Sequence, residues 1–487
     1  MRNVTTAAGR GTGRHGTGRV TRDTLLVPIL GVCLVVGTAA YLMVFTLMGQ
    51  IGASLDASRT ALDWITIATS IVGTVCAALF PAVGSALGQN RLMTAALACL
   101  AAGSLISAVA PDAGTLIAGR ILAAPGFAAG SLSVAIVRQH RSRVGLPGAF
   151  GVIAACEGAA AGVGFMLGGA IEAAARADWR TVFLAIAAIS VITGVMAAAT
   201  IPGGGGKAPR PDFTGALLLA GGLTAALLPV TEGATWGWTS WRTGALLAVA
   251  VVLLATWTGT ALARPDPLIQ LRILARPGVS GGILLFVVTS AAVSIVNITV
   301  PAFLEAPPAA SYGAAATVLE SGVDLVPFAA AITVAGYIAA RLTRRLLPSV
   351  IAAVTLSCEA LGLGLLAGFH QQVVTVVILV GVVGAGHGGT LAAEYVMLTR
   401  AARRAEAGAA AGLGSAAGGI SGAVAVAAIT PVLVRRLVRV GPVLLPAAAG
   451  YADAWLCGAA LAAGGAIAIG AMALTARGSA EHLAIED

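Results

Sequence analysis

Several ionisable side chains stand in the middle of long apolar stretches of this sequence. Glu157 and Glu359 each interrupt such a stretch, and Arg120 interrupts another. A charge at the centre of a bilayer costs about 2.5–3.5 kcal/mol on the insertion scale, so residues of this kind are candidates for function. Burial favours the protonated carboxyl group, which suits a side chain that carries protons.

Each of these residues has two interpretations at this stage. Arg120 either reaches the outer surface with its long side chain or presents a fixed cation to a central cavity. Glu157, roughly 15 Å along its predicted helix, is either a neutral structural acid or a site for a proton or a substrate cation. Glu359 lies at a comparable depth in its own helix.

Two further sets of residues share a face of a predicted helix. Glu320 and Asp324 are four residues apart, near a helix start where the dipole favours acids, so they serve either proton coupling or a solvated vestibule. His387 and Glu394 are seven residues apart. His387 stands among glycines and is either a hydrogen-bonded filler or a relay. We expect Glu394 near the inner surface, in water.

The elements that carry these residues must be membrane helices. The 487 residues are 58% hydrophobic and 10% charged, with a mean hydropathy of +0.94. Average soluble proteins are about a quarter charged, and disordered chains are poor in apolar residues, so both classes are excluded. The net charge of +9 comes from arginines grouped between apolar stretches. This distribution is typical of loops at a membrane surface and not of nucleic-acid binding.

Fourteen stretches are long and apolar enough to cross a bilayer, which takes about 20 residues. The predicted spans are 24–55, 64–90, 92–111, 115–137, 148–171, 181–206, 214–231, 243–263, 277–304, 316–340, 349–368, 372–398, 407–434 and 454–476. An all-α polytopic membrane protein follows.

The basic residues predict the orientation of these spans. Most of the 29 lie on the side of the N-terminal tail, which we therefore expect in the cytoplasm together with the C-terminus. The expected location is the plasma membrane. The basic segment 435–439 breaks the pattern, because fourteen spans place it outside.

Similar segments in the first and second halves of the sequence predict a duplicated architecture. The loop GSALGQNRLM after span 2 corresponds to ARLTRRLLPS after span 10, and spans 5 and 13 are both rich in glycine. Repeats of this kind are typical of secondary transporters. The predicted parts are a basic tail (1–23), a six-helix bundle (24–201), a linker (202–213), two extra helices (214–263), a second six-helix bundle (264–476) and a C-terminal tail (477–487).

The spacing of the glycines predicts close packing between some of the helices. With 64 glycines, many four residues apart, some helix faces lack side chains and let backbones approach closely. These faces either pack statically or form a seam on which two bundles move. The string GAGHGG at 384–389 also matches a dinucleotide fingerprint, but it lies inside a span, without the strand that the motif requires.

At this point the sequence resembles the major facilitator superfamily, and within it the fourteen-span drug–proton antiporters. The resemblance is strongest in GVGFMLGGAIEAAARADWRTVF at 162–183 and GRILAAPGFAAG at 119–130. The matching positions are Gly164, Gly168, Gly169, Trp179, Arg180, Phe183, Arg120 and Gly126. The sequence departs from the family pattern at Phe165, Ala123 and the Ser85–Ala86 pair, and helix 1 has Ala40 or an apolar neighbour where an aspartate is usual.

The resemblance implies a proton-coupled exporter of small hydrophobic compounds that works by alternating access as a monomer in the lipid bilayer, without a cofactor or a metal and without enzymatic activity. Rival interpretations are a same-fold importer or facilitator, a membrane sensor and an intramembrane enzyme. The candidate coupling and cavity residues are Arg120, Glu157, Asp324, Glu320, Glu359 and His387. The candidate packing or gating residues are Gly126, Gly164, Gly168, Gly169, Gly418 and Gly422.

Overall fold

The computed structural model of the chain describes residues 17–140, 145–173, 178–203, 212–264, 267, 271–402, 406–441 and 443–485. Its α-helices are α1 Thr17–Leu55, α2 Arg59–Leu87, α3 Gln89–Ala108, α4 Ala113–Ala123, α5 Ala129–His140, α6 Leu146–Ala173, α7 Trp179–Thr200, α8 Phe213–Trp236, α9 Trp241–Ala263, α10 Pro277–Glu305, α11 Val318–Asp324, α12 Val326–Leu342, α13 Pro348–Gly368, α14 Val373–Ala401, α15 Ala407–Val434 and α16 Ala448–Ile485. Three short 3-10 helices accompany them: η1 Ala124–Ala128, η2 Leu271–Ala275 and η3 Pro308–Ala310.

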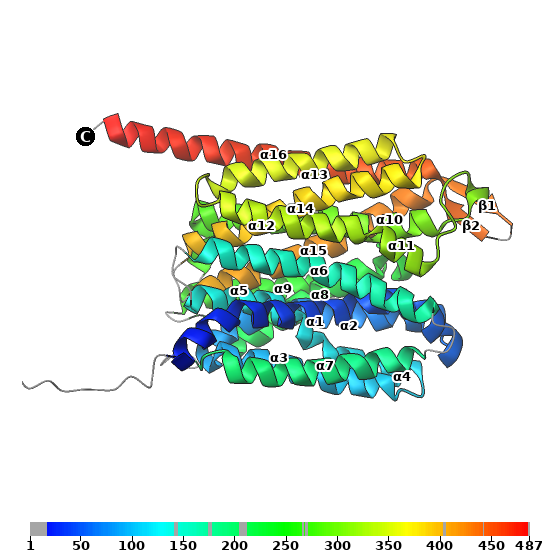
Figure 1. The fold of residues 1–487 in the computed structure, drawn as a ribbon, viewed down its shortest axis with the longest axis horizontal. Coiled ribbons are helices and arrows are strands. Elements are labelled where there is room, and N and C mark those ends of the chain that lie inside the picture. Colours follow the sequence, from blue (N-terminus) through cyan, green and yellow to red (C-terminus); the bar gives the residue numbers. More distant parts are fainter. Residues whose placement is uncertain are drawn as a thin grey trace, which may run out of the picture.

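The helices lie side by side and the chain runs back and forth along the bundle (Figure 1). Helix α1 begins and α16 finishes at the same end, on the left of the view. We call this the basic end, because Arg138, Arg276, Arg341, Arg344 and Arg400 lie on helix ends or turns there. The turns at the other end include the β-hairpin.

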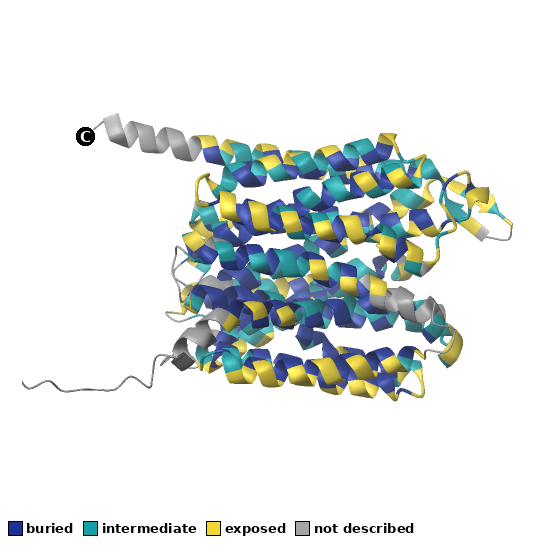
Figure 2. Ribbon diagram, in the orientation of Figure 1, coloured by how far each residue is buried: buried dark blue, intermediate teal, exposed yellow. Residues whose placement is uncertain are grey.

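The membrane-spanning character of the helices agrees with the sequence prediction. Thirteen helical segments in the described part of the chain are long and apolar enough to cross a membrane, and the described part of α6 adds a shorter apolar segment, Gly148–Gly164. Figure 2 shows buried residues between the helices and exposed ones on the outer faces. Large apolar side chains are exposed there, including Val191, Val195, Val251 and Val354, as expected for a surface that contacts lipid.

Two of the crossings are broken near a proline. Pro125 lies in η1, between α4 and α5, and Pro327 follows directly on the junction of α11 and α12. Proline lacks the N–H that an uninterrupted helix would use, so a break or kink at these points is expected. Arg120 is thereby carried on the short helix α4, and Glu320 and Asp324 on the short helix α11.

The first and last sets of helices form two packing groups that share an extensive boundary. In the first group α1 packs on α6 and α3 on α7, whereas in the last group α12 and α13 pack on α14, and α10 packs on α15. The groups meet mainly where α6 contacts α12 and where α2 contacts α15, and α6 also contacts α11 and α14 while α5 contacts α15. The pair α8–α9 packs through α8 against α2 and α15. We call the two groups the N-half (α1–α7) and the C-half (α10–α16).

The basic segment 435–439, expected in an outer loop, contributes to a β-hairpin. Strand β1 (Leu437–Val440) pairs antiparallel with β2 (Val443–Pro446), and Gly441 between them has a φ of 58°, which favours glycine. The following helix begins at Ala448, before the predicted start of span 14. Val438, Arg439 and Val440 alternate between apolar and polar, which is a short pattern typical of a strand.

Candidate functional site

Three polar side chains from three helices of the C-half meet in its interior. The hydroxyl of Thr289 on α10 donates to Oε2 of Glu359 on α13 at 3.4 Å, and it lies 2.8 Å from Nδ1 of His387 on α14. His387 Nδ1 is 4.0 Å from the other carboxylate oxygen. If Thr289 donates to Glu359, the same hydroxyl can only accept from His387, which places the imidazole proton on Nδ1. All three side chains are buried.

The glycines around His387 bring the neighbouring helices close enough for this contact. A Cβ on Gly386 would come within 2.7 Å of the Cα of Glu359, and one on Gly384 within 2.5 Å of a carbonyl oxygen of α12. Gly388 faces the backbone of α12 at similarly close range. The GAGHGG string therefore serves helix packing, because side chains at these positions would separate α14 from α12 and α13.

Glu394 lies two turns further along α14, and the expectation that it is solvated was wrong. Its side chain is fully buried, and neither carboxylate oxygen has a hydrogen-bond partner among the described residues. Glu157 and Glu359 both lie close enough for their charges to act on Glu394. The prediction failed because closeness to a helix end does not give solvent access when α6, α10, α12 and α13 all pack against that helix.

Glu157 is the contribution of the N-half to this group of carboxylates. It is partly buried on α6, and its Oε2 lacks a hydrogen-bond partner among the described residues. The adjacent Gly158 lies against Ala329 of α12, and the hydroxyl of Thr333 donates across the same contact to the carbonyl of Ala155 at 3.0 Å. Glu157 therefore lies beside the boundary between the halves. We call Glu157, Glu359 and Glu394 the carboxylate group.

An aromatic contact crosses the boundary next to the carboxylate group. Tyr395 on α14 lies 6.1 Å, centroid to centroid, from Phe150 on α6 and 5.7 Å from Phe286 on α10. Glu157 and Glu394 both act electrostatically on the phenol of Tyr395. The carboxylates are thus next to apolar rings that can contact an organic substrate.

Arg120 does not reach the outer surface, so the alternative in which it snorkels is wrong. Its side chain is 2% exposed. One guanidinium nitrogen donates to the carbonyl of Ala40 on α1 at 3.1 Å, and the guanidinium carbon lies 5.9 Å from the ring centroid of Phe183. Its Nε has no hydrogen-bond partner in the described part of the chain. Arg120 is a fixed cation between α1, α4 and α7.

Asp112 starts the helix that carries Arg120. Its carboxylate accepts from the backbone N–H of Thr115 at 2.8 Å and from the Thr115 hydroxyl at 3.1 Å. These hydrogen bonds hold the pKa of Asp112 below its ordinary value. The resulting N-cap fixes where α4 begins, and hence the depth of Arg120.

Glu320 and Asp324 lie apart from the carboxylate group. Glu320 is exposed and forms a capping box with Thr317 at the start of α11. Asp324 is partly buried at the end of the same short helix. The structure therefore places Glu320 in a helix cap, in line with the vestibule interpretation, and it does not bring this pair to Glu359 or Glu157.

The glycines singled out by the sequence face partners within their own half. A Cβ on Gly126 would touch Leu100 of α3, and one on Gly164 would touch Leu42 of α1. Gly418 and Gly422 face Ser290 and Ser294 of α10 in the same way. The surroundings of Gly168 and Gly169 lie outside the described residues.

Other glycines form the boundary between the halves. Gly158 and Gly162 of α6 face Ala329 of α12. On the other contact, Gly412 faces the carbonyl of Ala78 and Gly419 faces Thr74, both on α2. We call these four glycines the seam glycines.

The basic end holds further contacts that sequence reasoning missed. Arg138 of α5 is buried and donates to the carbonyl of Ala402, beyond α14, at 3.3 Å. Arg276 pairs with Glu406 at 2.6 Å. The first contact joins the two halves. The basic composition of these loops was visible in the sequence, but the pairing required the fold.

Comparison with known proteins identifies the family to which these features belong. Residues 29–426 match the model of the Major Facilitator Superfamily. The human organic anion transporter MFSD10 has a similar structure, with a TM-score of 0.61 at 13% identity, covering 92% of this chain and 99% of that one. At this identity the likeness concerns the fold alone.

Several proteins of similar sequence carry names that refer to resistance and transport. The puromycin resistance protein of Streptomyces alboniger is 29% identical over 54% of this chain and 52% of its own length. The methylenomycin A resistance protein of Streptomyces coelicolor is 26% identical over 60% of each chain. The probable actinorhodin transporter of the same species is 30% identical over 41% of this chain and 36% of its own length. The chain thus matches between about a third and three fifths of these relatives.

Proposed function

Because this chain belongs to the Major Facilitator Superfamily, we propose that it exports small, largely hydrophobic compounds in exchange for protons. The names of its relatives support export, since two are resistance proteins and one is a probable actinorhodin transporter. The chain is a multi-pass membrane transporter and not an enzyme. Its proposed location is the plasma membrane, as a monomer with both termini in the cytoplasm.

The carboxylate group is the observation that supports proton coupling. Glu157, Glu359 and Glu394 come from both halves, and each has at least one buried oxygen without a hydrogen-bond partner among the described residues. Three neighbouring carboxylates in an apolar interior cannot all be ionised without compensation. Such a group takes up and releases protons as its exposure to water changes.

The proposed cycle alternates the exposure of this group between the two sides of the membrane. Protons from outside neutralise carboxylates and favour one arrangement of the halves, and loss of protons to the cytoplasm favours the other. Contacts at the basic end, including Arg138 to Ala402 and Phe150 to Tyr395, must open for substrate to enter from that side. The seam glycines let the helices at the boundary lie close together.

Glu157 is the residue whose change tests this proposal most directly. In Glu157→Gln the amide imitates a permanently protonated carboxyl, so substrate still binds but a proton gradient no longer drives net export. The measurement uses purified protein in vesicles with an imposed pH difference. Radiolabelled puromycin and methylenomycin A are the first probes, because relatives are named for resistance to them. Binding is measured at equilibrium in parallel.

Asp112→Asn provides the matched control, since it makes the same chemical change at an exposed helix cap where asparagine caps equally well. It should export like the wild type. If Glu157→Gln also exports normally with unchanged pH dependence, the proton is carried elsewhere, and Glu394 and Glu359 are tested in the same way. Transport without any response to the pH difference would instead identify a facilitator of the same fold.

A further inference from the structure

A basic pocket lies at the turn between α12 and α13, at the basic end of the molecule and apart from the carboxylate group. Its volume is about 340 Å³, within the range of roughly 300–1,000 Å³ found for small-ligand sites. Its lining residues are Thr343, Arg344, Arg345, Leu346, Leu347, Val350 and Arg400. Export as proposed above uses none of them.

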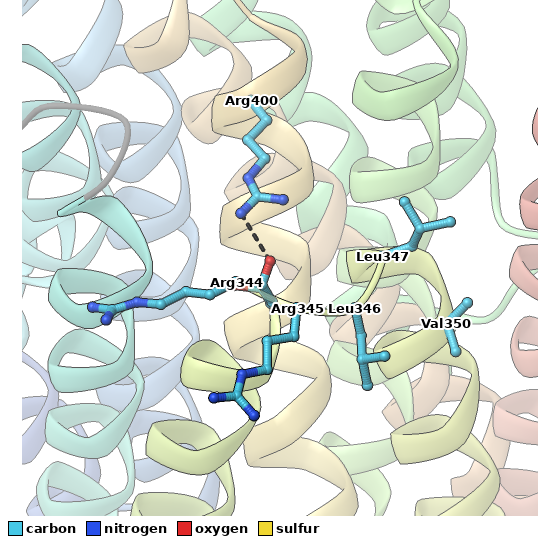
Figure 3. A pocket seen from close by; sticks show the side chains of 7 residues that line it. Arg344, Arg345, Leu346, Leu347, Val350 and Arg400 are labelled. Carbon is cyan, nitrogen blue, oxygen red and sulfur yellow. Dashed lines mark hydrogen bonds between the residues drawn. The ribbon is translucent and has the colours of Figure 1, made fainter.

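The pocket has a cationic side and an apolar side. Figure 3 shows Arg400 above the turn, Arg345 pointing down and Arg344 extending toward the neighbouring helix, with Leu346, Leu347 and Val350 on the opposite side. Arg400 is held in place because it donates to the carbonyl of Thr343 at 3.0 Å. Two of the apolar side chains remain substantially exposed, Leu346 at 49% and Leu347 at 44%.

Within the described part of the chain, the arginines of the pocket have no acidic partner, unlike other arginines at the same end. Arg276 pairs with Glu406, and Arg264 pairs with Asp212. Among the described residues, no ion pair involves Arg344, Arg345 or Arg400. Their positive charge is therefore available to a ligand that carries negative charge.

The backbone of the turn adds to this positive character. Helix α13, with 21 residues, begins at Pro348 beside the pocket, so its positive dipole end lies there. The carbonyl groups of Ala339 and Leu342, at the end of α12, already accept hydrogen bonds from backbone N–H groups of the turn. The carbonyl of Thr343 accepts from Arg400.

We propose that this pocket binds the phosphate headgroup of an anionic phospholipid in the leaflet at the basic end. Guanidinium groups bind phosphate oxygens in paired hydrogen bonds, which explains arginines at these positions. Leu346 and Leu347 contact the first part of the acyl chains. A free phosphate ion would leave the apolar side of the pocket uncovered. Basic pockets between membrane helices are suited to lipid headgroups.

The experiment compares lipids bound to the full-length purified protein in a neutral detergent. Phosphatidylglycerol or phosphatidylcholine with the same acyl chains is titrated, bound lipid is counted by native mass spectrometry, and the thermal unfolding midpoint is followed. The wild type should bind phosphatidylglycerol in preference and unfold at a higher temperature with it. Arg344→Gln/Arg345→Gln should reduce that binding about tenfold and abolish the temperature shift.

The matched control is Arg435→Gln/Arg436→Gln, which removes the same charge from exposed residues at the opposite end. It should bind phosphatidylglycerol like the wild type. Equal loss in both double variants, or no preference of the wild type for the anionic lipid, would overturn the proposal. A third arm adds inorganic phosphate or glycerol 3-phosphate. If either raises the unfolding temperature as phosphatidylglycerol does, the ligand is soluble and the lipid proposal is wrong.

Discussion

Thr289 shows how a single hydroxyl group can organise a buried site. It donates to Glu359 and accepts from His387, so one small side chain joins helices α10, α13 and α14. Without it the imidazole and the carboxylate face each other at 4.0 Å, too far for a hydrogen bond. The geometry of the C-half site therefore depends on a residue that does not itself titrate.

Replacement of this hydroxyl should be costly. Thr289→Val keeps the shape but leaves two buried polar groups without their partner, which costs about 1–3 kcal/mol. The measurement is the free energy of unfolding of the purified protein, together with the pH profile of export. Thr258→Val is the control, because the Thr258 hydroxyl binds only a carbonyl of its own helix. Equal stability of the two variants would show that the bridge is unimportant.

Arg120 should resist replacement by either alanine or lysine. Arg120→Ala frees the carbonyl of Ala40 and removes the contact with Phe183, and export should fall about tenfold, equivalent to about 1.4 kcal/mol of barrier. Arg120→Lys keeps the charge but not the planar fork, so an intermediate rate is expected. The rates are measured in vesicles at matched protein insertion. A fully active alanine variant would remove Arg120 from the transport cycle.

The candidate residues could be found in the sequence because ionisable side chains are rare in apolar stretches, but this criterion misses functional residues of common types. Glu157, Glu359 and His387 stand out because ionisable groups are uncommon in apolar stretches. Thr289 does not stand out, because hydroxyl side chains are frequent in membrane helices and usually donate to their own backbone, as Thr256 does. Glu394 was misjudged because its environment is set by neighbouring helices. These properties depend on tertiary contacts.

At the scale of elements, glycine spacing predicts close helix packing but not the packing partner. Gly158 and Gly164 both lie on α6, yet Gly158 faces α12 across the boundary and Gly164 faces α1 within the N-half. A helix turns by about 100° per residue, so two positions six residues apart lie about 120° apart around the axis, on different faces. Of the two alternatives, the position of Gly164 favours packing within the N-half, whereas Gly158 lies on the boundary between the halves.

The seam glycines make a sharp prediction at this scale. In Gly158→Ala the new Cβ would lie 2.6 Å from the carbonyl oxygen of Ala329, so α6 and α12 must separate. Transport should fall strongly while the protein still inserts. Gly364→Ala is the control, because a Cβ at Gly364 has no neighbour within 4 Å. Comparable transport by both variants, measured at equal amounts in the membrane, would show that close approach at the seam is not required.

For the whole molecule, the fourteen crossings and the helical fold could be predicted from the sequence. The reason is physical: each backbone polar group in lipid must be satisfied within its own helix, so a long apolar stretch has few alternatives. The division into parts at 24–201, 214–263 and 264–476 stays a prediction. Contacts across the basic end, such as Arg138 to Ala402, could not be predicted, because they join residues from distant parts of the chain.

The topology of the whole chain leads to a final prediction. Helix α1 begins and α16 ends at the basic end, and the hairpin around Gly441 lies among the turns at the opposite end. Positively charged loops are retained in the cytoplasm. A reporter that is active only in the cytoplasm should therefore be active after Asp487 and inactive when inserted at Gly441. The same insertion after Gly203, in the linker, should be active and serves as the control for folding.

The hairpin makes this test decisive, because arginines 435, 436 and 439 oppose the general charge pattern. If these residues determined the local topology, the Gly441 insertion would be active, and α15 and α16 would not cross as separate spans. If crossing is instead enforced by the two long apolar helices, the arginines are carried outside despite their charge. We expect the second result, since late loops have less influence on orientation than earlier ones. Activity at both Gly441 and Asp487 would contradict it.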